Sequence, residues 1–347
     1  MNFYKNFIVL LFLAAFFSCD IASVKANTLP DSVAQLMKTT PKEIDLKKQR
    51  KGMTSAGTYS FKLNGKEYIL KVFSKRQNQE SRQKEIDSVK IFSELDLGAK
   101  FVANNPDNSF YIREFVQGKP FKYEYLQDDK NLVTLAKALK KLHGHKTDLT
   151  SRNQLNRAEK HYDRIIKKKI AMPTSFEDSY NKFKTLNASL IVESGFCHND
   201  LNPHNILLSD NGNINFIDSS NAGNSNIYEE LGYVTMLNGV LGEKLETFLN
   251  AYFGRAPSQD ELNAVKLSQK LVCFLTSLVY FDFSESKKDK DIDLKTKIKT
   301  LDDVLNSDSQ ESALDMIKED KYVSIKSRPK DPVKQYALAF YKSFLNM

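Results

Sequence analysis

The sequence of 347 residues contains no tryptophan, three cysteines and five histidines. Three cysteines are too few for a disulfide-based scaffold or a Cys-rich zinc site. The histidines form no H-E-x-x-H motif, so we do not expect a catalytic metal held by imidazoles. Glycine and proline are modest, at 13 and 9 residues, and 41% of the residues are hydrophobic. This composition excludes a collagen-like or disordered chain and allows a sizeable core.

The net charge is +8, but the sequence has no run of five or more basic residues. Nor does it contain a stretch in which aromatic residues alternate with Lys or Arg. We therefore expect a solvated basic surface and no nucleic-acid partner.

Residues 1–26 have the pattern of a signal peptide. Lys5 precedes an apolar run, Phe7–Phe17, that is too short to span a bilayer comfortably. Val24-Lys25-Ala26 fits ordinary cleavage before Asn27, whereas Phe16-Phe17-Ser18-Cys19 is similar to a lipoprotein site, although Phe16 stands where Leu is usual. Another alternative is an uncleaved anchor with a cytoplasmic body. We expect export to the periplasm, envelope or medium, with membrane contact only through this segment.

Two cysteines, Cys197 and Cys273, remain if the first 26 residues are removed. Both lie beside apolar residues. We expect two buried free thiols rather than a disulfide.

Residues 27–118 predict a small β-rich lobe that follows a charged, helical lead-in. Two alternating runs flank Asn64-Gly65, which is a strong hairpin signal. A helix is expected at about 79–96, with Gly98 as its stop, and a strand at Phe110–Val116. Gly118-Lys119-Pro120 then breaks the pattern.

Residues 119–347 predict a larger helical lobe with one β-island at 205–218. The expected helices span 130–143, 152–170, 176–190, 228–252, 259–283, 296–318 and 331–346. Together the lobes predict a two-lobed α+β fold, and ligands of such folds commonly bind between the lobes.

Three oxygen-bearing side chains are expected to meet at one end of the hairpin in the β-island. Asn205 opens its first strand, Asp218 closes its second, and Asp200 lies in the loop before. In an antiparallel pair the start of one strand lies beside the end of the other. Carboxylate and amide oxygens suit Mg²⁺ bound together with phosphates. Asp200 has no local cationic partner in the sequence and could deprotonate a hydroxyl.

Lys71 is the second candidate group. It shares a strand face with Ile69 and Phe73, and an ammonium group between apolar neighbours needs an anion. Glu85 lies on the apolar face of the following helix and is the expected partner. Such a pair can hold the ammonium group where it meets the α- and β-phosphates of a nucleotide.

Two backbone segments complete the predicted nucleotide site. Residues 52–57 are expected to cover the phosphates, although they lack a full G-x-G-x-x-G motif. The stretch from Glu114 to Val116 is expected to offer its backbone to adenine.

From about Gly52 to Phe253 the chain resembles the aminoglycoside phosphotransferase and choline/ethanolamine kinase superfamily, which has the protein kinase-like fold. The resemblance is carried by a G-x-T start at Gly52-Met53-Thr54, by Lys71, by Leu139–His143, by H-x-D-x-x-x-x-N at His198–Asn205 and by Asp218. It implies a small β-rich N-lobe, a larger helical C-lobe and an ATP- and Mg²⁺-dependent small-molecule kinase.

The resemblance also implies roles for single residues. Asp200 would be the catalytic base, and Asn205 and Asp218 would be Mg²⁺ ligands. Lys71 would hold the phosphates and Glu85 would orient Lys71. His198 would brace the loop rather than act as the base.

The chain departs from its relatives at several positions. Protein kinases carry Arg before the catalytic Asp, where this chain has Asn199, and there is little room for an activation segment. Choline kinases often have an aromatic and an acidic residue after the metal Asp, replaced here by Ser219 and Ser220. Without Trp, an ammonium cage would need Tyr or Phe, such as Tyr228 or Tyr233.

Two functions are compatible with these features. The first is phosphate transfer from ATP to a hydroxyl of a choline-, ethanolamine- or aminoglycoside-like acceptor. The second is an exported, non-catalytic binding protein on the same scaffold, which the export signal favours because ATP is scarce in a bacterial envelope.

Overall fold

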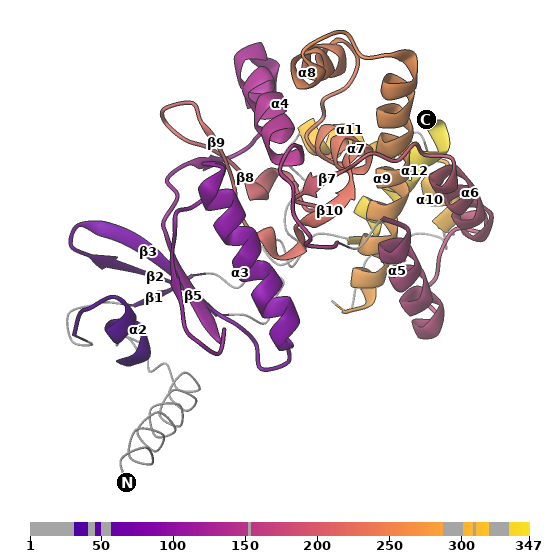
Figure 1. Ribbon diagram of the computed structural model, residues 1–347. Helices are drawn as coiled ribbons and strands as arrows, with labels where there is room; N and C mark the ends of the chain where they lie inside the picture. The colour runs from indigo at the N-terminus through magenta and orange to yellow at the C-terminus, as the bar shows by residue number, and fades with distance from the viewer. Residues whose placement is uncertain are drawn as a thin grey trace. The chain divides into compact units, whose positions relative to one another are not determined.

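The computed structural model describes residues 31–40, 46–49, 57–151, 154–286, 301–307, 310–318 and 333–347. The chain forms two compact units that divide between Gln117 and Gly118. The first is built on a five-stranded sheet and the second is mainly helical (Figure 1). The predicted α+β class is confirmed. The predicted signal peptide lies outside the described residues.

The sheet of the first unit is antiparallel, with strand order β1-β2-β3-β5-β4. Asn64 and Gly65 connect β2 to β3 with φ angles of 51° and 76°, the left-handed values that a two-residue hairpin turn needs. β5 ends at Glu114, so the strand expected to reach Val116 is two residues shorter. The elements are α2 (Asp31–Leu36), β1 (Lys47–Lys48), β2 (Gly57–Leu63), β3 (Lys66–Val72), α3 (Gln79–Glu94), β4 (Phe101–Asn104) and β5 (Phe110–Glu114).

The two faces of this sheet pack against different helices. Leu70 of β3 belongs to a buried cluster with Val33 of α2. Tyr111 of β5 belongs to another cluster with Val89 of α3. Successive strand residues point to opposite faces, so Lys71 lies on the α3 face.

Helix α3 ends earlier than predicted. Asp96, with a φ of 54°, takes a left-handed conformation just past the helix, two residues before Gly98, the predicted stop. An aspartate tolerates this conformation better than most residues because its short side chain can form local bonds. The Asp96 carboxylate accepts from Lys100 Nζ at 2.9 Å, so the stop is a polar turn.

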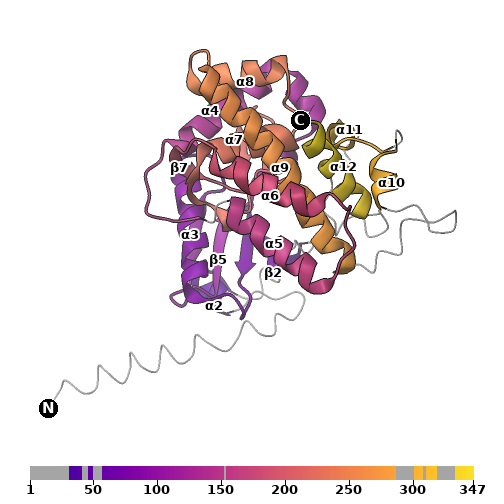
Figure 2. The ribbon, with the colours of Figure 1, turned by 90° about the vertical axis from the view of Figure 1, so that its right-hand side faces the viewer.

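Helix α9 is the central element of the second unit and contacts α5, α6, α7 and α12 (Figure 2). The helices of this unit are η3 (Tyr123–Gln127), α4 (Asp129–His143), α5 (Gln154–Lys168), α6 (Phe176–Ala188), η4 (Pro203–Asn205), η5 (Ser219–Asn221), α7 (Ile227–Leu237), α8 (Glu243–Phe253), α9 (Gln259–Ser286), α10 (Leu301–Leu305), α11 (Ala313–Lys318) and α12 (Val333–Asn346).

Two predicted helices are wrong because each is divided. The helix expected over 228–252 is broken between α7 and α8, where Gly239 and Gly242 have positive φ angles. The helix expected over 296–318 is interrupted between α10 and α11. Ser312 starts α11, since its Oγ accepts the Asp315 N–H at 3.3 Å and its own N–H donates back to Asp315.

The second unit contains more strands than the single β-island predicted. β8 (Ile206–Leu208) and β9 (Ile214–Phe216) form the expected hairpin. A two-residue strand, β6 (Lys119–Pro120), extends it, so part of the predicted break is a strand. β7 (Ser194–Cys197) and β10 (Gly223–Asn226) pair separately. Strands this short have too few residues for alternation to be visible in the sequence.

One helix among the described residues, Gln259–Ser284 of α9, is long and apolar enough to cross a membrane, but 78% of its most apolar window is buried inside the protein. Cys197 and Cys273 are free and buried, as predicted. Burial raises the pKa of the Cys273 thiol to about 12, so it stays protonated.

Candidate functional site

Lys71 and Glu85 form a buried ion pair in the first unit. Lys71 Nζ lies 2.5 Å from Glu85 Oε1, and the two side chains are 11% and 3% exposed. Tyr111 Oη, from the neighbouring strand, donates to the same glutamate oxygen at 3.2 Å. The pair therefore fixes an ammonium group against the α3 face of the sheet.

The other candidates of the first unit are less constrained. Glu114 closes β5, where its side chain accepts from Lys66 at 3.4 Å and its N–H donates to Lys100 O. Val116 lies beyond the end of the strand. Gly52 and Thr54 lie outside the described residues.

In the second unit, the loop from His198 to Asn205 connects β7 to β8. Asn205 Nδ2 donates to the backbone oxygen of Asp200 at 2.7 Å, which ties the two ends of the loop together. The Asp200 side chain accepts from Tyr233 Oη at 3.1 Å and from Asn202 Nδ2 at 3.3 Å, both through Oδ1. Among the described residues, none donates to Asp200 Oδ2, so this oxygen is available to accept a proton.

Asp218 reaches the same place from the other strand of the hairpin. The Ile217 N–H donates to Asn205 O at 3.0 Å, which fixes Asp218 next to the loop. Asp218 is left-handed, with φ 62° and ψ 56°, and begins η5. Its charge helps raise the pKa of Asp200, so the two carboxylates interact. The predicted convergence of Asp200, Asn205 and Asp218 is present.

The side-chain oxygens of Asn205 and Asp218 are of a kind that fits a hard divalent cation. The Asn205 amide uses its nitrogen for the Asp200 carbonyl, and no described residue donates to its oxygen. That oxygen and the Asp218 carboxylate are both of the ligand type that Mg²⁺ prefers. These two residues would hold the ion.

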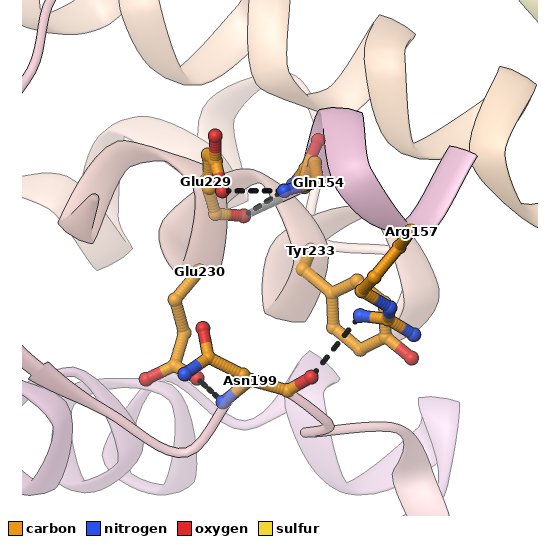
Figure 3. Close-up of a pocket in the computed structure, with 6 residues that line it drawn as sticks. All are labelled: Gln154, Arg157, Asn199, Glu229, Glu230 and Tyr233. Carbon is orange, nitrogen blue, oxygen red and sulfur yellow. Dashed lines mark hydrogen bonds between the residues drawn. The ribbon is translucent and has the colours of Figure 1, made fainter. Parts of the chain in front are cut away.

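A buried carboxylate, Glu230 of α7, binds the backbone of the loop at Asn199 (Figure 3). Its Oε2 accepts from the His198 N–H at 3.1 Å, and its Oε1 from the Asn199 N–H at 2.5 Å. His143 Nε2 donates to Oε2 at 2.9 Å. Burial alone raises the pKa of Glu230, but the His143 hydrogen bond and the other partners outweigh it and hold that pKa below its usual value. The loop is thus held by an ionised carboxylate.

His143, Cys197 and Glu230 lie close together, with ligand atoms within 4.8 Å of one another, but they do not suit a metal. Burial raises the pKa of the Cys197 thiol well above its usual value. His143 Nδ1 lies 2.7 Å from Tyr252 Oη, so both ring nitrogens have partners. His143 and Glu230 thus use their polar atoms in hydrogen bonds, and the Cys197 thiol donates to Ser225 O at 3.8 Å.

Asn199, the residue before Asp200, fixes the backbone of this loop. Its φ is 63°, a left-handed conformation that Asn adopts more readily than most residues. Its amide nitrogen donates to Ser151 Oγ at 2.9 Å. His198 braces the other side through Nε2, 2.9 Å from Ile217 O.

Asp200 has a cationic neighbour that the sequence did not reveal. Arg157 of α5 donates from Nη1 to Asn199 O at 3.2 Å, and its guanidinium carbon lies 5.8 Å from the centre of the Tyr233 ring (Figure 3). Burial raises the pKa of Asp200, and Arg157 is the largest effect opposing that rise. The sequence contains no cationic partner close to Asp200 along the chain, and the fold supplies Arg157 from a distant segment.

Tyr228 and Tyr233 do not form an ammonium cage. Five residues apart on α7, they lie on different sides of the helix. Tyr228 is 3% exposed, and its hydroxyl donates to Glu193 at 3.3 Å. One face of Tyr233 is already next to the Arg157 guanidinium.

Sequence reasoning missed the roles of Arg157, His143 and Glu230. Arg157 precedes Asp200 by 43 residues and has no local signal. Glu230 does have a signal in the sequence, because Glu229 and Glu230 are charged residues within a helix whose residues are all buried. Charged groups in such a helix require partners.

The family resemblance is confirmed by comparison with known proteins. The sequence model of the choline/ethanolamine kinase family matches residues 49–233. No match is found among curated protein sequences.

Solved structures share the fold at low sequence identity. A choline/ethanolamine kinase family protein from Mesorhizobium loti has a TM-score of 0.60 at 14% identity, covering 90% of this chain and 98% of that one. The choline kinase LicA from Streptococcus pneumoniae has a TM-score of 0.57 at 20% identity, covering 74% and 89%. The ternary complex of streptomycin, ATP and APH(2")-IIa has a TM-score of 0.51 at 13% identity, covering 73% and 89%.

These neighbours confirm the protein kinase-like fold predicted from the sequence. The matched region of the family model contains Lys71, Asp200 and Asp218. Because that model spans more than half of the chain, the protein belongs to the choline/ethanolamine kinase family.

Proposed function

We propose that the protein transfers the γ-phosphate of ATP, with Mg²⁺, to a hydroxyl group of a small molecule. The observation that carries the proposal is the convergence of Asp200, Asn205 and Asp218 at one end of the β8–β9 hairpin. Family membership supports the same reaction class. We take choline-, ethanolamine- and aminoglycoside-like alcohols as the first acceptors to test, since the similar proteins are named for such compounds.

The ion pair of the first unit supports nucleotide binding. We propose that Lys71 Nζ, fixed by Glu85, contacts the phosphates, because an oriented ammonium group offers hydrogen-bond donors and charge together. Gly52, Thr54 and the backbone from Glu114 to Val116 remain proposed nucleotide contacts.

Asp200 is the proposed general base. In the transfer, the acceptor oxygen forms a bond to the γ-phosphorus, the bond from that phosphorus to the ADP oxygen breaks, and the hydroxyl proton passes to Asp200. Oδ2 is the oxygen placed to take it, because Tyr233 and Asn202 bind Oδ1. When bound through Asn205 and Asp218, Mg²⁺ would neutralise charge on the phosphates.

The test is a product assay with the purified protein, Mg·ATP and a panel of choline, ethanolamine, aminoglycosides and sugars. We expect phosphorylated product from at least one acceptor and thermal stabilisation by Mg·ATP. Lys71→Met should weaken nucleotide binding, with Lys75→Met, an exposed lysine just past the strand, as the control.

Binding of Mg·ATP without product from any acceptor would instead favour the non-catalytic binding protein. Absence of nucleotide binding would contradict both.

We also propose that residues 1–26 direct export, on the sequence pattern alone. N-terminal sequencing of protein made in a bacterial host should find Asn27 or a modified Cys19. An intact Met1 would contradict cleavage and favour the membrane-anchored alternative.

A further inference from the structure

Arg157 has donors that the described part of the protein does not use. A guanidinium group carries five N–H bonds. One, on Nη1, goes to Asn199 O at 3.2 Å, and no other described residue accepts from the group. The side chain is nevertheless half-buried, and its guanidinium lies over the Tyr233 ring. A partly desolvated guanidinium group with four free donors is set up to bind an acceptor from outside the protein.

Asp200 and Glu229 interact with Arg157 through charge, but no hydrogen bond joins either carboxylate to its guanidinium group. Glu230 is occupied by His143 and two backbone N–H groups. Glu229 accepts from the Gln154 N–H at 3.2 Å, and burial raises its pKa. The remaining guanidinium donors of Arg157 are therefore available beside the proposed catalytic base.

We propose that Arg157 binds an oxyanion next to Asp200 during the reaction. The planar fork of a guanidinium group matches two oxygens of a phosphate or carboxylate group. The oxyanion is either the phosphoryl group in transfer or an anionic group on the acceptor. Either group can present two oxygens to the N–H donors of the Arg157 guanidinium. The inference rests on the proposed phosphotransfer.

A positive charge at this place also bears on the acceptor class. The Arg157 guanidinium already lies over the ring of Tyr233, whose hydroxyl donates to Asp200. A quaternary ammonium group on this ring would be repelled by the like charge of Arg157. We expect acceptors without a permanent cation next to the reacting hydroxyl to be preferred over choline.

The first experiment compares steady-state kinetics of Arg157→Gln, Arg157→Lys and Lys160→Gln. Lys160 is on the same helix and exposed, so its substitution removes the same charge without touching the site. Arg157→Gln should lower kcat/KM by about 100-fold, as loss of a transition-state donor does. Arg157→Lys should recover part of it, because the charge stays while the fork is lost.

The kinetic pattern identifies the source of the oxyanion. A fall in kcat that is equal for all acceptors assigns Arg157 to the phosphoryl group. A rise in KM confined to acceptors with a carboxylate or phosphate assigns it to the acceptor. Kinetics of Arg157→Gln that match Lys160→Gln would overturn the proposal, provided that thermal melting shows both variants folded.

Inorganic phosphate gives a second readout that needs no turnover. It is titrated against the protein with saturating Mg·ADP, which occupies the proposed nucleotide site, and binding is followed by thermal shift. Arg157→Gln should weaken phosphate binding at least tenfold, whereas Lys160→Gln should not; equal binding by both would overturn the inference. If wild type transfers to no acceptor, the proposed function fails, and the phosphate titration still decides the role of Arg157.

Discussion

Two adjacent residues, Glu229 and Glu230, show how local partners determine the ionisation of a buried carboxyl group. Both belong to α7 and both are buried. Burial raises the pKa of Glu229, whereas the partners of Glu230 hold its pKa below the usual value. Folding therefore favours the charged form of Glu230 and disfavours that of Glu229.

Glu230→Gln should destabilise the protein at neutral pH by about 3 kcal/mol, since it removes a buried charge that accepts three hydrogen bonds. The pKa of Glu230 is lowered on folding, so its contribution is complete above the unfolded pKa and is lost as pH falls through the folded value. Urea unfolding at several pH values measures this.

Glu229→Gln is the matched comparison. Because the folded state already disfavours the charged form of Glu229, Glu229→Gln should leave the free energy of unfolding at neutral pH unchanged or slightly higher. An equal loss in both variants would contradict the distinction between the two glutamates.

Asp200→Asn should lower the rate of phosphate transfer at least about 100-fold, because the general base is lost. The same substitution should raise Tm at neutral pH. Burial raises the pKa of Asp200, so ionisation costs the folded state stability once pH exceeds the ordinary aspartate value. The gain in Tm should shrink as pH falls toward that value.

Asp210→Asn serves as the control, because Asp210 is exposed in the turn of the same hairpin. It should change neither activity nor Tm. Unaltered turnover in Asp200→Asn would refute the assignment of the base.

At the scale of elements, the contact between α7 and α9 depends on one glycine. A Cβ atom on Gly232 would lie 2.2 Å from Ser268 Cβ and 2.7 Å from the Ser268 backbone carbon. The two helices therefore approach more closely than any larger side chain permits. The same α7 carries Glu230 and Tyr233, so this approach positions the site.

Gly232→Ala should destabilise the protein by roughly 2 kcal/mol, as overpacking outweighs the better helix propensity of alanine. Gly254→Ala is the control: its φ of 75° and ψ of 13° are left-handed, which costs an alanine about 1 kcal/mol, and its added Cβ would come no closer than 3.4 Å to another atom. Chemical denaturation measures the loss of stability in both variants, and a larger loss in Gly254→Ala than in Gly232→Ala would contradict the prediction.

Local signals predicted some elements and failed for others. Asn64-Gly65 specified its hairpin, and helical spacing placed Glu85 against Lys71, because both are short-range patterns. The break between α7 and α8 was overlooked although Gly239 and Gly242 mark it. The proximity of Arg157 to Asp200 depends on how α5 packs in the second unit, which no spacing in the chain encodes.

At the scale of the whole molecule, the two cysteines of the described structure are buried free thiols and form no disulfide. We expect Tm to be independent of reductant. Denatured protein should show two titratable thiols if cleavage occurs after Ala26, and three if the first 26 residues are retained. A reductant-dependent Tm would contradict the free-thiol assignment.

If residues 1–26 direct export as proposed, the chain crosses the membrane before it folds, and the apolar character of α9 then has a consequence. In a translocation channel, an apolar segment such as Gln259–Ser284 could leave sideways into the lipid and stop transfer of the chain. Gln269, which in the folded unit donates to Thr235 and Val240, and Asp282, which binds His161 and Arg164, would oppose that escape. The polar groups that fasten α9 to its neighbours after folding would thus also keep it moving toward the far side of the bilayer.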